Sequence, residues 1–69
     1  MHNWKKTILK MTDTMEEAVR VLNQESLRIV MVVDDDERLI GSITDGDIRR
    51  GLIRQLPMNI ALAEIMHNF

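Results

Sequence analysis

The stretch from Gly41 to Arg50, which reads G-S-I-T-D-G-D-I-R-R, constrains the fold of this chain more than any other. An apolar, β-branched run ends in it at Ile43, and an arginine-rich amphipathic run leaves it at Ile48. This order predicts a strand that turns directly into a helix. Such a corner brings backbone N–H groups, a hydroxyl and carboxylates to one place, as in many phosphate and nucleotide sites. The polar residues between the two runs are Thr44, Asp45, Gly46 and Asp47.

The first half of the chain predicts a strand, a helix and a second strand. Thr7, Ile8 and Leu9 suit only a short strand. Thr14 begins a helix and forms a capping box with Glu17, in which each residue bonds the backbone N–H of the other. Apolar residues then recur at helical spacing, and Asn23 to Ser26 end the helix. The apolar residues are Met15, Ala18, Val19 and Leu22.

The run from Leu27 to Val33 is nearly continuous and β-branched, which predicts a strand covered on both faces. The strand Leu39 to Thr44 should pair with it in antiparallel orientation. Asp34 to Arg38 lie between them, and their acids invite a calcium interpretation. The calcium-loop pattern, however, needs an acid or amide where Arg38 stands, and its glycine and distal glutamate are missing. We therefore expect a solvated hairpin tip.

The second half predicts two helices. Ile48, Leu52 and Leu56 mark the buried side of the first, which Pro57 should end because proline lacks an N–H. Gly51 inside it costs about 1 kcal/mol relative to alanine, which indicates either close approach of another backbone or simple tolerance. Asn59 to Phe69 predict a further short helix with one apolar side. That side consists of Leu62, Ile65, Met66 and Phe69.

Composition limits the chain to one small domain of modest stability. It has 69 residues, no cysteine and 45% hydrophobic residues, so association with a copy of itself or with a neighbouring domain should stabilise it. Trp4 would cap the edge of the core or anchor a partner domain. The net charge of -2 argues against nucleic acid. No apolar run approaches the roughly 20 residues of a membrane span, and residues 1–6 lack a secretory signal, so we expect a cytoplasmic protein with no membrane partner.

The chemistry of the corner suits a nucleoside phosphate. If the helix begins near Gly46, its free N–H groups, including those of Asp47 and Ile48, attract an anion. The Thr44 hydroxyl can donate to a phosphate oxygen, and Gly46 lets a ligand approach the backbone. The Asp47 carboxylate would accept bonds from ribose hydroxyls. Arg49 or Arg50 could offset the phosphate charge.

Several other interpretations of the same residues remain open. Thr44 or Asp45 could simply cap the helix, with Asp47 in its first turn for dipole reasons. Asp45 and Asp47 could form an acid/base pair, although no serine–histidine–acid set accompanies them. His2 and His67 lie near opposite ends of the chain and lack a third zinc ligand. Arginines could track nucleic acid, but aromatic residues for base stacking are missing. These arginines are Arg49, Arg50 and Arg54, the last two of them i, i+4 neighbours.

At this point the residues resemble a known family. The order of elements, the run V-V-D-D-D-E-R-L-I-G-S-I-T-D-G-D-I and the E-I-M after the second helix resemble a CBS domain, the regulatory module named after cystathionine β-synthase. The resemblance extends from about Thr7 to Met66 and is strongest at Gly41, Thr44 and Asp47. It implies an α+β fold, a β-α-β-β-α unit with a small sheet packed against two helices, here followed by a short C-terminal helix.

The resemblance also implies a ligand. In that family the aspartate holds the ribose of an adenosine nucleotide and the threonine contacts phosphate, while adenine lies among apolar residues that correspond to Met11–Asp13 and Leu27–Val30. AMP, ADP, ATP and S-adenosylmethionine are the candidate regulatory ligands, and no cofactor is required. Met31 departs from the proline of many members and should alter the pocket wall. The candidate ligand-binding residues are therefore Thr12, Ile29, Thr44, Asp45, Gly46, Asp47 and Arg50.

CBS domains usually occur as tandem pairs with ligand clefts between them. We expect one CBS domain over residues 1–69, with a core at about 7–56, and with 57–69 as linker and start of a second domain. A homodimer or a tandem partner would complete the cleft. The N-terminal W-K-K-x-I-L and the T-D-G-D-I-R-R resemble CBS pairs that precede sugar-phosphate nucleotidyltransferases. The T-D-G-D-I-R-R motif also resembles CBS pairs that are attached to sugar-phosphate isomerases. The expected function is regulatory and non-catalytic; the alternative is a structural dimerisation module that binds no ligand.

Overall fold

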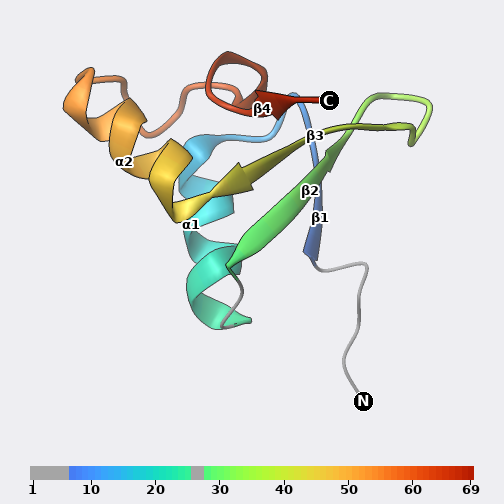
Figure 1. Ribbon diagram of the computed structural model, residues 1–69, viewed down its shortest axis with the longest axis horizontal. Helices are drawn as coiled ribbons and strands as arrows, with labels where there is room; N and C mark the ends of the chain where they lie inside the picture. The colour runs from blue at the N-terminus through green and yellow to red at the C-terminus, as the bar shows by residue number, and fades with distance from the viewer. Residues whose placement is uncertain (1–6, 26–27) are drawn as a thin grey trace.

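A four-stranded sheet and two helices make up the computed structural model, which describes residues 7–25 and 28–69 (Figure 1). The expectation for Trp4 and the start of the predicted 27–33 strand lie outside these residues. The elements are β1 (Ile8–Lys10), α1 (Met15–Gln24), β2 (Ile29–Val33), β3 (Leu39–Thr44), α2 (Asp45–Ile53), the 3₁₀ helix η2 (Leu62–Glu64) and β4 (His67–Asn68).

The sheet has the order β1-β2-β3-β4 and mixes the two kinds of strand pairing. β1 runs parallel to β2, since α1 connects them, whereas β2 and β3 form the predicted antiparallel hairpin. The β-α-β-β-α order and the α+β class are confirmed. The hairpin tip from Asp34 to Arg38 is mostly exposed, as expected for a solvated turn.

Both helices begin at a threonine cap, but the first cap is simpler than predicted. The Thr14 hydroxyl accepts from the Glu17 amide at 3.3 Å. The Glu17 carboxylate pairs with Arg20 at 3.1 Å, and no bond from it to the Thr14 amide forms. The capping box predicted there is therefore only half present, because an arginine one turn further along competes for the carboxylate.

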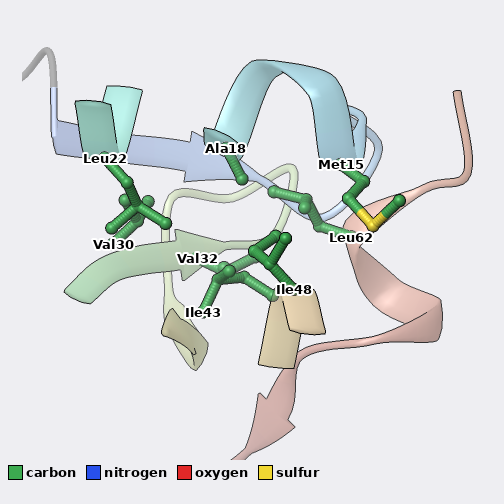
Figure 2. Packing of buried hydrophobic residues seen from close by; sticks show 8 residues of the cluster. All are labelled: Met15, Ala18, Leu22, Val30, Val32, Ile43, Ile48 and Leu62. Carbon is green, nitrogen blue, oxygen red and sulfur yellow. The ribbon is translucent and has the colours of Figure 1, made fainter. Parts of the chain in front are cut away.

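The core lies between the helices and one face of the sheet (Figure 2). Val30 and Val32 of β2 and Ile43 of β3 are completely buried in this core. Burial of each large side chain contributes about 1.5–3 kcal/mol to folding. The buried cluster comprises Met15, Ala18, Leu22, Val30, Val32, Ile43, Ile48 and Leu62.

Within the described residues the opposite face of the sheet carries no helix, since α1 and α2 lie on the same side of it (Figure 1). Ile29 is accordingly 41% exposed and Met31 is half-buried. The prediction that this strand is covered on both faces is therefore wrong within the described residues. A continuous apolar run indicates that both faces of a strand need to be buried, but the helices described in this chain cover only one face of the sheet.

The C-terminal segment does not form the predicted helix over 59–69. Its backbone bonds to residues that are distant in the sequence: the Leu62 amide donates to the Asp13 carbonyl at 2.8 Å, and the Phe69 amide donates to the Ile40 carbonyl at 3.1 Å. Only the short η2 forms before β4 pairs with β3. Gly41 permits this pairing, because a Cβ there would lie 2.6 Å from the His67 carbonyl oxygen.

Helix α2 ends three residues earlier than the position of Pro57 suggested. Gln55 adopts a left-handed φ of 62°, its amide donates to the Leu52 carbonyl, and the Leu56 amide donates to Gly51. These two bonds form a Schellman motif, which satisfies carbonyls that the helix would leave unpaired. The helix thus stops by its own C-cap before proline is reached.

Candidate functional site

The corner between β3 and α2 has no connecting residue. Thr44 is the last residue of β3 and the N-cap of α2, which begins at Asp45. The Thr44 hydroxyl accepts from the Asp47 amide at 3.3 Å, and the Asp47 carboxylate accepts from the Thr44 amide at 2.8 Å. This reciprocal pair is a capping box, so the interpretation of Thr44 as a helix cap is confirmed.

Asp47 is the buried acid of the corner, with only 5% of its surface exposed. Its Oδ2 accepts from both the amide and the hydroxyl of Thr44, the latter at 3.0 Å. Its Oδ1 accepts from the guanidinium of Arg50, whose side chain is 69% exposed. Buried carboxylates require such compensation, and here both oxygens have a donor.

This network changes the set of donors available to a ligand. The Asp47 amide is bonded to Thr44, and the Ile48 amide lies where the first intrahelical bond forms. The amides of Asp45 and Gly46 remain, because the first N–H groups of a helix have no intrahelical acceptor. The Thr44 hydroxyl already donates to Asp47, so it cannot donate to a phosphate until that bond opens.

Gly46 is exposed at the mouth of the corner and is not required by the fold. A Cβ there would lie 3.6 Å from the Thr44 hydroxyl and 3.7 Å from an Arg50 nitrogen, which are ordinary contacts. Gly51 differs, because a Cβ there would lie 3.2 Å from the Met15 sulfur. Close packing of a side chain, rather than of another backbone, explains Gly51.

The structure brings together all the candidate ligand-binding residues except Thr12. Ile29 lies directly across from Thr44 in the β2–β3 register. Thr12 follows β1 at the other end of β2, where the neighbouring Met11 amide donates to Val33 at 2.9 Å. The length of β2, about 13 Å at 3.3 Å per residue, separates the two positions.

The two arginines that could offset a phosphate charge lie on different sides of α2. Arg50 reaches Asp47, whereas Arg49 lines a groove of about 780 Å³ between α1 and α2. The apolar side chains of Val19, Leu52 and Met58 also line that groove. Only Arg50 therefore belongs to the corner.

The sequence did not predict a second cleft, of about 280 Å³, between α2 and the C-terminal segment, which we call the α2–β4 cleft. Arg54, Glu64 and His67 line it together with Asp47 and Arg50. The sequence predicted a helix over 59–69, whereas His67 lies on β4. The i, i+4 spacing of Arg50 and Arg54 was the available signal, since it puts both on one helix face.

Clusters of metal-ligating side chains and helices long enough for a membrane span are both absent from the residues that the structure describes. Across residues 7–25 and 28–69, no three histidine, aspartate or glutamate side chains gather as a metal site would require. None of the helices in these residues has the length and apolarity to cross a bilayer.

Comparison with known proteins decides the family. The model of the CBS domain family matches residues 5–54. The chain belongs to the CBS domain family. This membership agrees with the β-α-β-β-α order of the elements and with the strand-to-helix corner at Thr44.

Relatives and solved structures share parts of this domain. The uncharacterized protein RP505 of Rickettsia prowazekii is 35% identical over 52 residues, 75% of this chain and 16% of that protein. A CBS domain protein of Pyrobaculum aerophilum complexed with AMP has a TM-score of 0.82 at 19% identity, covering 88% of this chain and 48% of that one. The CBS domain pair of protein MJ0100, in complex with 5′-methylthioadenosine and S-adenosyl-L-methionine, has a TM-score of 0.76 at 24% identity, covering 88% and 47%. The chain therefore spans about half the length of these solved structures and a small part of the longer relative.

Proposed function

We propose that this CBS domain is a non-catalytic regulatory module that binds an adenosine nucleotide and signals its occupancy to an attached catalytic domain. Family membership supports the regulatory role. Two proteins of the same fold hold AMP or S-adenosylmethionine-type ligands, which supports an adenosine ligand. AMP, ADP, ATP and S-adenosylmethionine are the ligands to test.

The proposal rests mainly on two neighbouring residues: Gly46, which the packing of the fold does not require, and Asp47, whose carboxylate is buried. Glycine is a poorer helix former than alanine, and no atom of residues 7–25 and 28–69 lies close enough to Gly46 to require it. A ligand that lies against the backbone would explain the glycine. Asp47 then lies within reach of ribose hydroxyls, with the amides of Asp45 and Gly46 facing the same ligand.

Binding would require the capping network to rearrange. Arg50 is largely exposed, so its guanidinium can swing away from the Asp47 Oδ1, and a ribose hydroxyl would then take its place as donor to the buried carboxylate. Thr44 would keep its amide bond to Oδ2 while its hydroxyl turns to the ligand. The ligand would thereby select one arrangement of the corner over another, which is a population shift.

A partner would complete the cleft from the open face of the sheet. Ile29, which is 41% exposed, lies opposite Thr44 at the edge of that face. We propose a tandem CBS domain or a second copy of this chain as its cover, in a cytoplasmic protein. The N-terminal W-K-K-x-I-L and the T-D-G-D-I-R-R favour a sugar-phosphate nucleotidyltransferase as the regulated domain. Residues 57–69 would then lead into the second domain, although Leu62 is buried in the core of this one.

The rival function is a structural dimerisation module. The closed hydrogen-bond network of Thr44, Asp47 and Arg50 favours it, because each group already has a partner without any ligand.

A thermal-shift screen with the four adenosine compounds separates the two functions. A ligand at 100 times its Kd should add about 2.7 kcal/mol to the free energy of unfolding. Gly46→Ala should raise the unfolding temperature of the free protein slightly and reduce the ligand-induced shift. No shift with any compound at millimolar concentration, in a folded protein, would favour the structural module.

A further inference from the structure

The cleft between α2 and the C-terminal segment has two positively charged side chains on one wall. Arg50 and Arg54 stand one helical turn apart, and residues Glu64 to His67 form the opposite wall. Its volume of about 280 Å³ is just below that of typical small-molecule pockets, which begin near 300 Å³. The cleft therefore suits a phosphorylated sugar better than a whole nucleotide.

The two guanidinium groups have donors to spare. Arg50 gives one nitrogen to Asp47 and is 69% exposed, so its other N–H groups face water. The Arg54 side chain makes no hydrogen bond or ion pair in residues 7–25 and 28–69. Guanidinium groups present forked donors that match phosphate oxygens, and two of them can hold one phosphate from two sides.

Of the two arginines of the cleft, Arg50 is paired with an acid, whereas Arg54 has no ion-pair partner among residues 7–25 and 28–69. Asp47 is buried and its oxygens are occupied by Thr44 and Arg50. Glu64 on the opposite wall is exposed and pairs with neither arginine. An Arg54–Glu64 ion pair would have given Arg54 a structural explanation, and the structure does not form it.

We propose that the α2–β4 cleft binds a phosphate monoester on a sugar, with Arg50 and Arg54 as its donors and His67 at its edge. The inference rests on the proposed function where the phosphate belongs to an adenosine nucleotide: the ribose then contacts Asp47, which lines both the corner and the cleft. A free sugar phosphate presents the same chemistry. Either ligand would connect α2 with β4, the last strand of the domain.

The experiment measures binding to the whole 69-residue chain by isothermal titration calorimetry. The probes are adenosine, AMP, ribose 5-phosphate and inorganic phosphate. Arg54→Gln should weaken the phosphate monoesters about tenfold or more, as expected for a lost charge-assisted bond, and leave adenosine unchanged. Glu64→Gln should strengthen the same ligands, because it removes the opposing charge.

Arg49→Gln is the matched control. It makes the same change of charge on the same helix, but its side chain lines the α1–α2 groove instead. Equal effects of Arg49→Gln and Arg54→Gln would overturn the cleft assignment, as would folded protein that binds no phosphate monoester at millimolar concentration. Adenosine binding with no gain from phosphate would overturn the cleft and leave the proposed function intact. Binding of ribose 5-phosphate that depends on Arg54, without any adenosine binding, would support the cleft and contradict the adenosine function.

Discussion

Two regions of this domain use the same chemistry in different surroundings. At the β3–α2 corner, Asp47 accepts from the backbone and hydroxyl of Thr44 and from Arg50. At the hairpin tip, Asp34 accepts from the amides of Asp36 and Arg38 at 2.9 Å and from the Arg38 side chain at 3.1 Å.

Burial separates these two aspartates. Asp47 is 5% exposed, whereas the Asp34 side chain is 20% exposed and its arginine is 74% exposed. Water can replace the partners of Asp34 when they are removed, but it reaches Asp47 poorly. The same hydrogen-bond pattern therefore contributes little to stability at the exposed hairpin tip. At the buried corner, loss of one partner leaves a polar group unsatisfied and destabilises the fold more.

The largest loss of stability is predicted for a substitution that disrupts the β3–α2 corner. Asp47→Ala leaves the Thr44 amide without its acceptor and removes half of the capping box, so it should lower the free energy of unfolding by about 2–3 kcal/mol. Asp34→Ala is the matched substitution at the hairpin tip and should cost clearly less. Urea denaturation of both variants measures the difference, and equal losses would show that burial does not distinguish the two sites.

A smaller effect is expected from the other half of the box. Thr44→Val keeps the shape of the side chain but loses the hydroxyl that caps the Asp47 amide, which should cost about 1 kcal/mol. Thr44→Ser should retain most of the stability, because serine is also a good N-cap. The same denaturation experiment checks both, and an equally large loss in Thr44→Ser would show that the methyl group, not the hydroxyl, matters.

The smallest effect concerns pH at the hairpin tip. The amide of Arg38, together with that of Asp36 and the Arg38 charge, holds the pKa of Asp34 below its ordinary value of 3.8. Asp34 therefore stabilises the fold above that value and loses this contribution as pH falls through its lower folded pKa. Asp34→Asn should flatten the acid limb of the stability curve slightly. Unfolding temperatures measured between pH 6 and pH 2, in steps, compare the two proteins, and parallel curves would contradict the assignment.

Most of the fold could be predicted because its signals are local. The spacing of Met15, Ala18 and Leu22 and the β-branched run before Val33 determine an element without reference to the rest of the chain. The C-terminal segment could not be predicted in this way. Its apolar spacing suggests a helix, but its amides bond to Asp13 and Ile40, and such distant partners leave no periodic pattern.

The candidate site likewise has one part that local sequence predicts and another part that depends on tertiary packing. Thr44 and Asp47 are three residues apart, so the sequence already indicated a cap as well as a ligand site. The burial of Asp47 is a tertiary property, and the cleft lined by Arg54 and His67 depends on where β4 packs. The separation of Thr12 from Thr44 likewise follows from the strand register rather than from any local motif.

The most direct test of the account follows the backbone amides of the corner by NMR during a titration with AMP. The amides of Thr44 and Asp47 report on the capping network, and that of Gly46 reports on the first turn of α2. The amides of Asp36 and Arg38 report on the equivalent network at the hairpin tip. The account predicts saturable shifts at the corner and none at the tip. Corner amides that do not move at millimolar AMP, or that move no more than those of the tip, would contradict it.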